Sequence, residues 1–195
     1  MLVAISLMAL LSVILFSGLR FGIRAWEAGG DHIDRPMRIE RIQNLLRQVI
    51  GQALLPAPAA IGDPVPTFLG DPKSLTFLAP LPAHRGIAGP HLFQLARRES
   101  GGRSDLMLTW TLFRPERVAR ELVPEQGKQS VLIENVAVVK LSYYGALDEQ
   151  RPPEWQSVWD GVNLRPRLVR LHVEFPLGDP RRWQDLIIRV VGSEC

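Results

Sequence analysis

The sequence predicts an α+β protein in which a long N-terminal helix packs on antiparallel β-sheets. Residues 1–19 are apolar and uncharged, and residues 37–55 repeat apolar side chains at helical spacing. From residue 73 onward, short apolar stretches alternate with turn signals, as in antiparallel sheets. The chain also has 16 prolines in 195 residues, most of them after position 55, which favours strands and loops over a helical bundle.

The first segment, MLVAISLMALLSVILFSGL, contains no charged side chain and no proline. At about 1.5 Å per residue it forms a helix of roughly 28 Å, close to the roughly 30 Å hydrocarbon core of a bilayer. Residues 1–19 are therefore expected to be a transmembrane and assembly helix. Its apolar surface is expected to include Leu2, Val3, Ile5, Leu7, Leu10, Leu11, Ile14 and Leu15.

A cleaved secretory signal and a buried helix of a soluble protein are the alternatives for this segment. The signal is disfavoured because no basic residue precedes Arg20 and the apolar core is too long. The buried helix is disfavoured because an unbroken apolar run of this length more often spans a membrane.

Residues 20–55 are expected to continue the helix, with a kink or break near 29–36, where two glycines and a proline interrupt the pattern. The second half is amphipathic. Its apolar stripe comprises Ile39, Ile42, Leu45, Leu46 and Val49. Residues 56–72 contain five prolines and two glycines and are expected to form a crossover loop.

Residues 73–195 are expected to form an antiparallel β head domain. The segment 168–175 alternates apolar and polar residues most regularly, as in a strand with one buried face. The segment 105–113 is apolar on both faces, which predicts a central strand, and 98–103 reads as a hairpin turn. The other expected strands lie at 74–79, 91–97, 131–133, 136–144 and 185–191.

Charge and composition argue against several functions. The net charge of +3, from 23 basic and 20 acidic residues, is too balanced for a nucleic-acid interface. Cys195 is the only cysteine, so no intrachain disulfide or cysteine-based metal site can form. The four histidines are scattered, and no catalytic, phosphate-binding or calcium-loop motif occurs. We therefore expect no enzyme, no cofactor and no metal, with His172 solvated on the polar face of a strand.

Trp155 and Trp159 lie in a loop that follows two prolines. Exposed tryptophans can stack on a sugar or a protein partner, so the pair is a candidate partner surface. At a spacing of four residues, they can equally form one face of a short helical turn packed on the core.

The run Met1–Ile5, followed by Leu7, Ala9–Leu11 and Val13, resembles the N-terminal helix of type IV pilins and type II secretion pseudopilins. That family begins with Gly, a methylated Phe, Thr, Leu, any residue and Glu, and the present chain is expected to start just after this Glu. The family orientation implies a single-pass inner-membrane protein with its C-terminal domain in the periplasm. Arg20 and Arg24 alone would favour the opposite orientation.

Features of the second half resemble the J-type minor pseudopilins, also called general secretion pathway protein J. They are the strand around Leu106–Trp110, the run from Val131 into Tyr144, and the tryptophan pair before Arg167–Leu171. The resemblance implies a pseudopilus subunit near the tip, beside the I- and K-type minor pseudopilins, that supports protein export across the outer membrane. The alternatives are a membrane-anchored periplasmic binding module that uses the tryptophan loop, and a minor pilin of a type IV pilus.

Overall fold

The computed structural model describes residues 37–54, 68–81, 89–113, 127–148, 150–160 and 164–191. The chain divides into two compact units, Met1–Arg41 and Ile42–Cys195. The expected transmembrane residues 1–19 and the expected kink near 29–36 lie outside the described residues. In the part that is described, no helix has the length and apolar character needed to cross a membrane.

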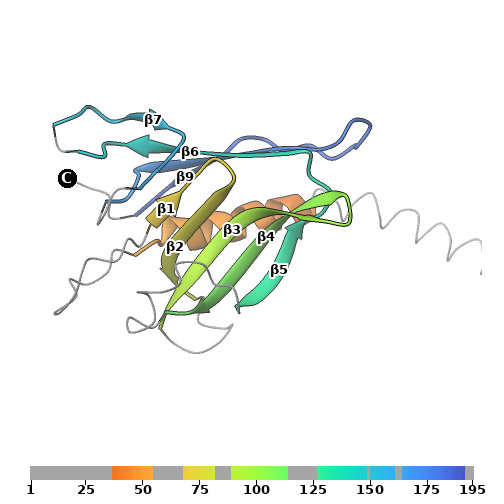
Figure 1. Ribbon diagram of the computed structural model, residues 1–195, viewed down its shortest axis with the longest axis horizontal. Helices are drawn as coiled ribbons and strands as arrows, with labels where there is room; N and C mark the ends of the chain where they lie inside the picture. The colour runs from red at the N-terminus through yellow and green to blue at the C-terminus, as the bar shows by residue number, and fades with distance from the viewer. Residues whose placement is uncertain are drawn as a thin grey trace, which may run out of the picture. The chain divides into compact units, whose positions relative to one another are not determined.

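Two antiparallel sheets make up most of the second unit (Figure 1). The first sheet has five strands in sequence order: β1 (Phe68–Gly70), β2 (Ser74–Pro80), β3 (Pro90–Ser100), β4 (Arg103–Leu112) and β5 (Lys128–Ile133). The second has four strands in the order β7 (Glu154–Gln156), β6 (Val138–Gly145), β8 (Leu168–Glu174) and β9 (Leu186–Arg189).

The expected fold class, a long N-terminal helix packed on sheets, is wrong for the described chain. That chain is mostly β, and its only helix is short, covering residues 37–51. The helix ends where its last carbonyl and an amide after it bond to other segments of the chain instead. The amide of Leu54 donates to the Leu78 carbonyl in β2 (2.7 Å), and the Gly51 carbonyl accepts a hydrogen bond from Val191 (2.8 Å).

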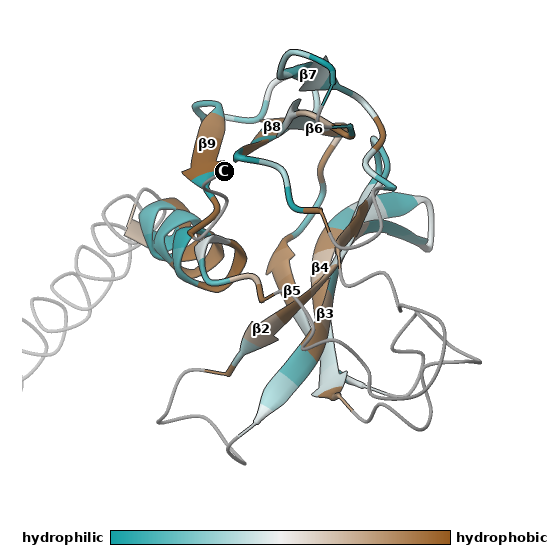
Figure 2. Cartoon of the chain, turned by 90° about the vertical axis from the view of Figure 1, so that its left-hand side faces the viewer, coloured by the Kyte–Doolittle hydropathy of each residue, from teal (hydrophilic) through white to brown (hydrophobic). Residues whose placement is uncertain are grey.

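The predicted apolar stripe lies on this helix. Leu46 and Val49 are buried in the core together with Ile50 and Ala53. Ile42 and Leu45 are partly buried against the same core, and Ile39 has intermediate exposure. Brown and teal segments alternate along the helix in Figure 2, as expected for an amphipathic helix whose apolar side packs inward.

The strands follow the sequence pattern closely in several places. In β8, Val169, Leu171 and Val173 are buried, while the residues between them are partly exposed. β4 lies between β3 and β5, as expected for a strand that is apolar on both faces. The β3–β4 hairpin turns at Gly101 and Gly102, whose φ values of 59° and 78° suit a tight turn that glycine adopts without strain.

The sequence analysis missed two strands and placed the beginning of a third too late. β1 lies inside the segment 56–72 that we predicted to be a loop, and β7 lies inside the tryptophan loop. β5 starts at Lys128, three residues before the predicted strand. Both missed strands have only three residues, too few for an alternating pattern to be visible.

One hydrophobic core is shared by the helix and both sheets. Phe77 of β2 and Phe93 of β3 stack with ring centroids 5.5 Å apart. Phe68 of β1 meets Tyr143 of β6 edge-on at 6.2 Å, so aromatic contacts join the two sheets as well as neighbouring strands.

Candidate interaction surface

The two tryptophans that we predicted as a joint partner surface lie in different environments. Trp155 is in β7 and is 39% exposed. Trp159 is fully buried, and its indole nitrogen donates to the Leu164 carbonyl at 3.1 Å. The segment between them is extended and bent, not helical. Only Trp155 can therefore meet a partner, and Trp159 is a core residue.

Trp159 and Gly70 form a seam between the two sheets. Each backbone amide donates to the other residue's carbonyl, at 2.8 and 2.7 Å. A Cβ atom on Gly70 would lie 2.2 Å from the ring of Tyr143. The single proton of the Tyr143 hydroxyl is shared between the carbonyls of Asp71 (3.0 Å) and Ser74 (3.3 Å). Burial, with a smaller effect of the Asp71 charge, raises the pKa of this phenol. Tyr143 therefore stays neutral and serves as a structural donor.

Arg165 forms a hydrogen bond between the segment before β8 and the segment that follows the helix. Its guanidinium donates to the carbonyl of Ala53, two residues after the helix ends. Burial lowers the pKa of Arg165 from its usual value. A cation at this end of a helix is also favoured by the helix dipole.

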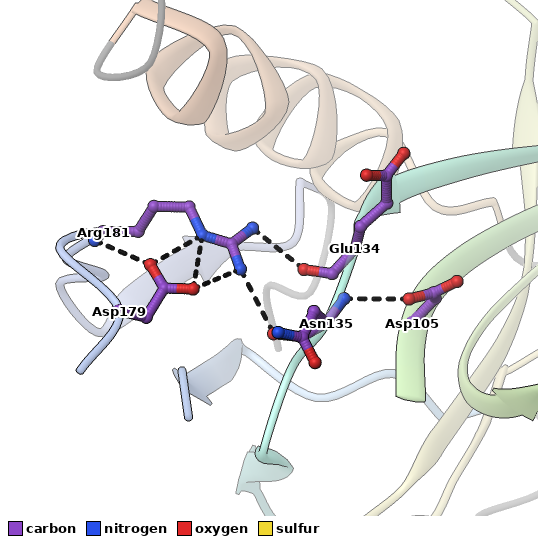
Figure 3. Close-up of polar contacts among 5 residues, drawn as sticks. All are labelled: Asp105, Glu134, Asn135, Asp179 and Arg181. Atoms are coloured by element: carbon purple, nitrogen blue, oxygen red, sulfur yellow. Dashed lines mark hydrogen bonds and ion pairs between the residues drawn. The ribbon is translucent and has the colours of Figure 1, made fainter. Parts of the chain in front are cut away.

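Arg181 holds together two connections that lie far apart in the sequence (Figure 3). It forms an ion pair with Asp179 (2.7 Å) and donates to the carbonyls of Glu134 (2.9 Å) and Asn135 (3.2 Å). The amide of Asn135, a residue with a left-handed φ of 53°, donates to Asp105 at 2.8 Å. This network ties the β8–β9 connection to the β5–β6 connection and to β4.

Replacing Arg181 with methionine is expected to lower the free energy of unfolding by about 2 kcal/mol, because its charged hydrogen bonds to Asp179 and to two carbonyls are lost. Arg182→Met is the matched control, since Arg182 is the exposed neighbour and should change stability by less than about 0.5 kcal/mol. Urea unfolding of the full chain in mild detergent, followed by circular dichroism, measures both. Equal effects of the two substitutions would contradict the role assigned to Arg181.

The outer face of the four-stranded sheet carries an aromatic and arginine patch. We define the outer patch as Tyr144, Trp155, Leu168, Arg170 and Ile187. Register places Tyr144 beside both Trp155 and Leu168, and Arg170 beside Ile187. The Trp155 ring lies 5.4 Å from the Tyr144 ring, and the Arg170 guanidinium carbon lies 4.0 Å from the Trp155 centroid, within cation–π range.

His172 lies further along the same face of β8, between two carboxylates. Its Nδ1 is 2.6 Å from Asp185 and its Nε2 is 3.0 Å from Glu174, and Lys140 is its register partner on β6. The hydrogen bond with Asp185, then that with Glu174, raises the pKa of His172, whereas burial opposes this shift. We expected His172 to contact only solvent. The structure shows that it also contacts two carboxylates.

The stability contributed by His172 is expected to decrease as the pH rises. Because its folded pKa is raised, this contribution is complete below the unfolded histidine value of about 6.5 and is lost as the pH rises through the folded value. His172→Gln should therefore destabilise the protein more at about pH 5.5 than at about pH 8.5. Urea unfolding at the two pH values measures the difference, and an equal loss at both would contradict the charged network.

No group of three metal-ligating side chains is found within the described segments, and the acidic residues near the tryptophan loop form none there. The ring of His172 contacts two carboxylates and forms a charge cluster with them. The outer face of this sheet places aromatic, apolar and cationic groups side by side, which makes it a candidate interaction surface.

No protein-family model matches this chain, and no curated protein matches it.

The partners of three important residues were missed by sequence reasoning. The alternation within the segment 168–175 puts Arg170 and His172 on its polar face, but their neighbours Trp155 and Asp185 come from other strands and connections. Arg181 bonds to carbonyls 46 and 47 residues away. No local sequence pattern predicts these contacts, because they join residues that are far apart in the sequence.

Proposed function

We propose that this protein is a minor pseudopilin of a type II secretion system, an assembly subunit that supports protein export across the outer membrane. Residues 1–19 anchor it in the inner membrane, and the β-rich head lies in the periplasm. Its partners are the I- and K-type minor pseudopilins at the tip of the pseudopilus. The proposal starts from the sequence resemblance.

The observation that carries the proposal is the attachment of the helix at 37–51 to the head. Leu46, Val49 and Ile50 are buried in the shared core. Leu54 after the helix bonds to β2, and Gly51 at the helix end bonds to the segment after β9. A subunit that is pulled from a bilayer into a filament needs a head that stays joined to the segment following its anchor. This attachment meets that requirement, while the surface of the head remains free to select neighbours.

The outer patch supports an assembly role over a sugar-binding module. Stacking on a sugar needs an open aromatic face, but Arg170 covers one side of the Trp155 ring and Tyr144 packs against it. The second tryptophan is buried and offers no platform. A protein partner needs no open ring face, since tryptophan, tyrosine and arginine act together in protein interfaces.

Co-purification tests the proposal. The full chain is expressed in the membrane with the I- and K-type minor pseudopilins of the same cell and extracted in mild detergent. We expect a stable mixed complex, and deletion of the gene should abolish export of type II substrates to the medium. A variant in which residues 1–19 are replaced by an unrelated transmembrane helix is the control and should stay in the membrane without restoring export. A chain that co-purifies with none of these subunits and is dispensable for export would refute the proposal.

A further inference from the structure

The outer patch has the composition of an interface centre. Trp155 remains 39% exposed and Ile187 47% exposed, although each lies beside an arginine or an aromatic ring. Tryptophan, tyrosine and arginine are the residues that most often carry the binding energy of protein interfaces. Their grouping on one face of a sheet therefore marks the patch as a candidate for a specific contact.

Arg170 is the only member of the outer patch with a formal charge, and that charge is not neutralised. In the segments that the structure describes, Arg170 forms no ion pair, and its buried Nε has no hydrogen-bond partner. Two carboxylates further along this face, Glu174 at the end of β8 and Asp185 just before β9, both bind His172 instead. By contrast, the guanidinium of Arg181 is paired with Asp179.

Trp155 holds the unpaired guanidinium in place. Stacking at 4.0 Å from the ring centroid restricts the arginine side chain, so less conformational entropy is lost when a ligand binds it. A carboxylate is the complementary group, since the planar guanidinium donates two parallel hydrogen bonds to it. Around this charge, Leu168 and Ile187 offer apolar area.

We propose that the outer patch docks onto a neighbouring subunit of the assembly, whose head presents an exposed carboxylate surrounded by apolar side chains to Arg170. This inference rests on the proposed function and adds to it the surface and the chemistry of the contact. Arg170 and Trp155 form the centre of the contact. Lys140, on the same sheet face but beside His172 and its two carboxylates, lies outside it.

The test measures the dissociation constant of the full chain in detergent for its minor pseudopilin partners. Arg170→Gln and Trp155→Ala should each weaken binding by about tenfold or more, as central interface residues do. Arg170→Lys should recover only part of the loss, because an ammonium lacks the planar fork. Lys140→Gln is the matched control on the same face and should change binding by less than about twofold. Circular dichroism should show that all four variants stay folded.

Each outcome decides between the inference and its alternatives. If Arg170→Gln binds as tightly as the unmodified chain, the docking surface is refuted while the proposed function stands. If the unmodified chain binds no minor pseudopilin, the proposed function fails, and the inference fails with it. Self-association of the chain, or binding to vesicles of anionic lipid, that is lost in Arg170→Gln would refute the neighbouring subunit as the occupant.

Discussion

Trp159→Ala is expected to lower the free energy of unfolding by about 3–5 kcal/mol, the usual cost of truncating a large buried aromatic side chain. Trp159 is fully buried among residues of both sheets, and its indole nitrogen is satisfied by the Leu164 carbonyl. Its truncation leaves a cavity at the seam and removes that hydrogen bond. Urea unfolding of the full chain in mild detergent, followed by circular dichroism, measures the loss.

Trp155→Ala is the matched control for this experiment. The same substitution four residues earlier removes a side chain that is 39% exposed, and we expect it to cost less than about 1.5 kcal/mol, mainly from the contacts with Arg170 and Tyr144. A comparable loss in both variants would contradict the assignment of Trp159 to the core and of Trp155 to the surface.

Gly70→Ala is expected to destabilise the protein by about 3 kcal/mol or more, because overpacking in a rigid site forces the backbone to shift. The added Cβ would lie 2.2 Å from Cζ and 2.4 Å from the hydroxyl oxygen of Tyr143. Tyr143 cannot move aside easily, since its ring is fully buried and its hydroxyl bonds to two carbonyls. Hydrogen exchange should show lost protection of the Gly70 and Trp159 amides, which bond to each other's carbonyls.

Gly178→Ala separates this steric clash from ordinary glycine strain. Gly178 has a φ of 87° but no atom within 4 Å of an added Cβ, so alanine there should cost only about 1 kcal/mol. If the Gly70 variant is no less stable than the Gly178 variant, the backbone at the seam can shift without loss of stability. That result would contradict the close packing described above.

The β-rich part of the fold could be predicted because its signals are local. The alternation of β8, the two apolar faces of β4 and the paired glycines of the β3–β4 turn each lie within about ten residues of sequence. The apolar stripe of the helix is equally local, and Leu46 and Val49 are buried as an inward face requires. The length of that helix was wrongly predicted, because Gly51 and Leu54 bond to segments that local periodicity cannot include.

The candidate binding surface could be predicted only in part. Trp155 and Trp159 were expected to act as a pair, either as a partner surface or as one face of a helical turn on the core, and the bridge between Trp159 and Gly70 separates them instead. That bridge buries one indole and leaves the other on the outer face. Arg170 gained its partner ring only because β7 and β8 pair with opposite sides of β6.

The sequence by itself determined where the longer strands lie, which face of the helix is apolar, and that a long uncharged run precedes the head. These properties depend on the intrinsic periodicity and polarity of neighbouring residues. Only the tertiary structure decided that both sheets and the helix end share one core, that Arg181 joins two distant connections, and that an unpaired guanidinium rests on Trp155. Such contacts join residues from different strands, and strand register, which fixes them, is settled only when the sheets pack together.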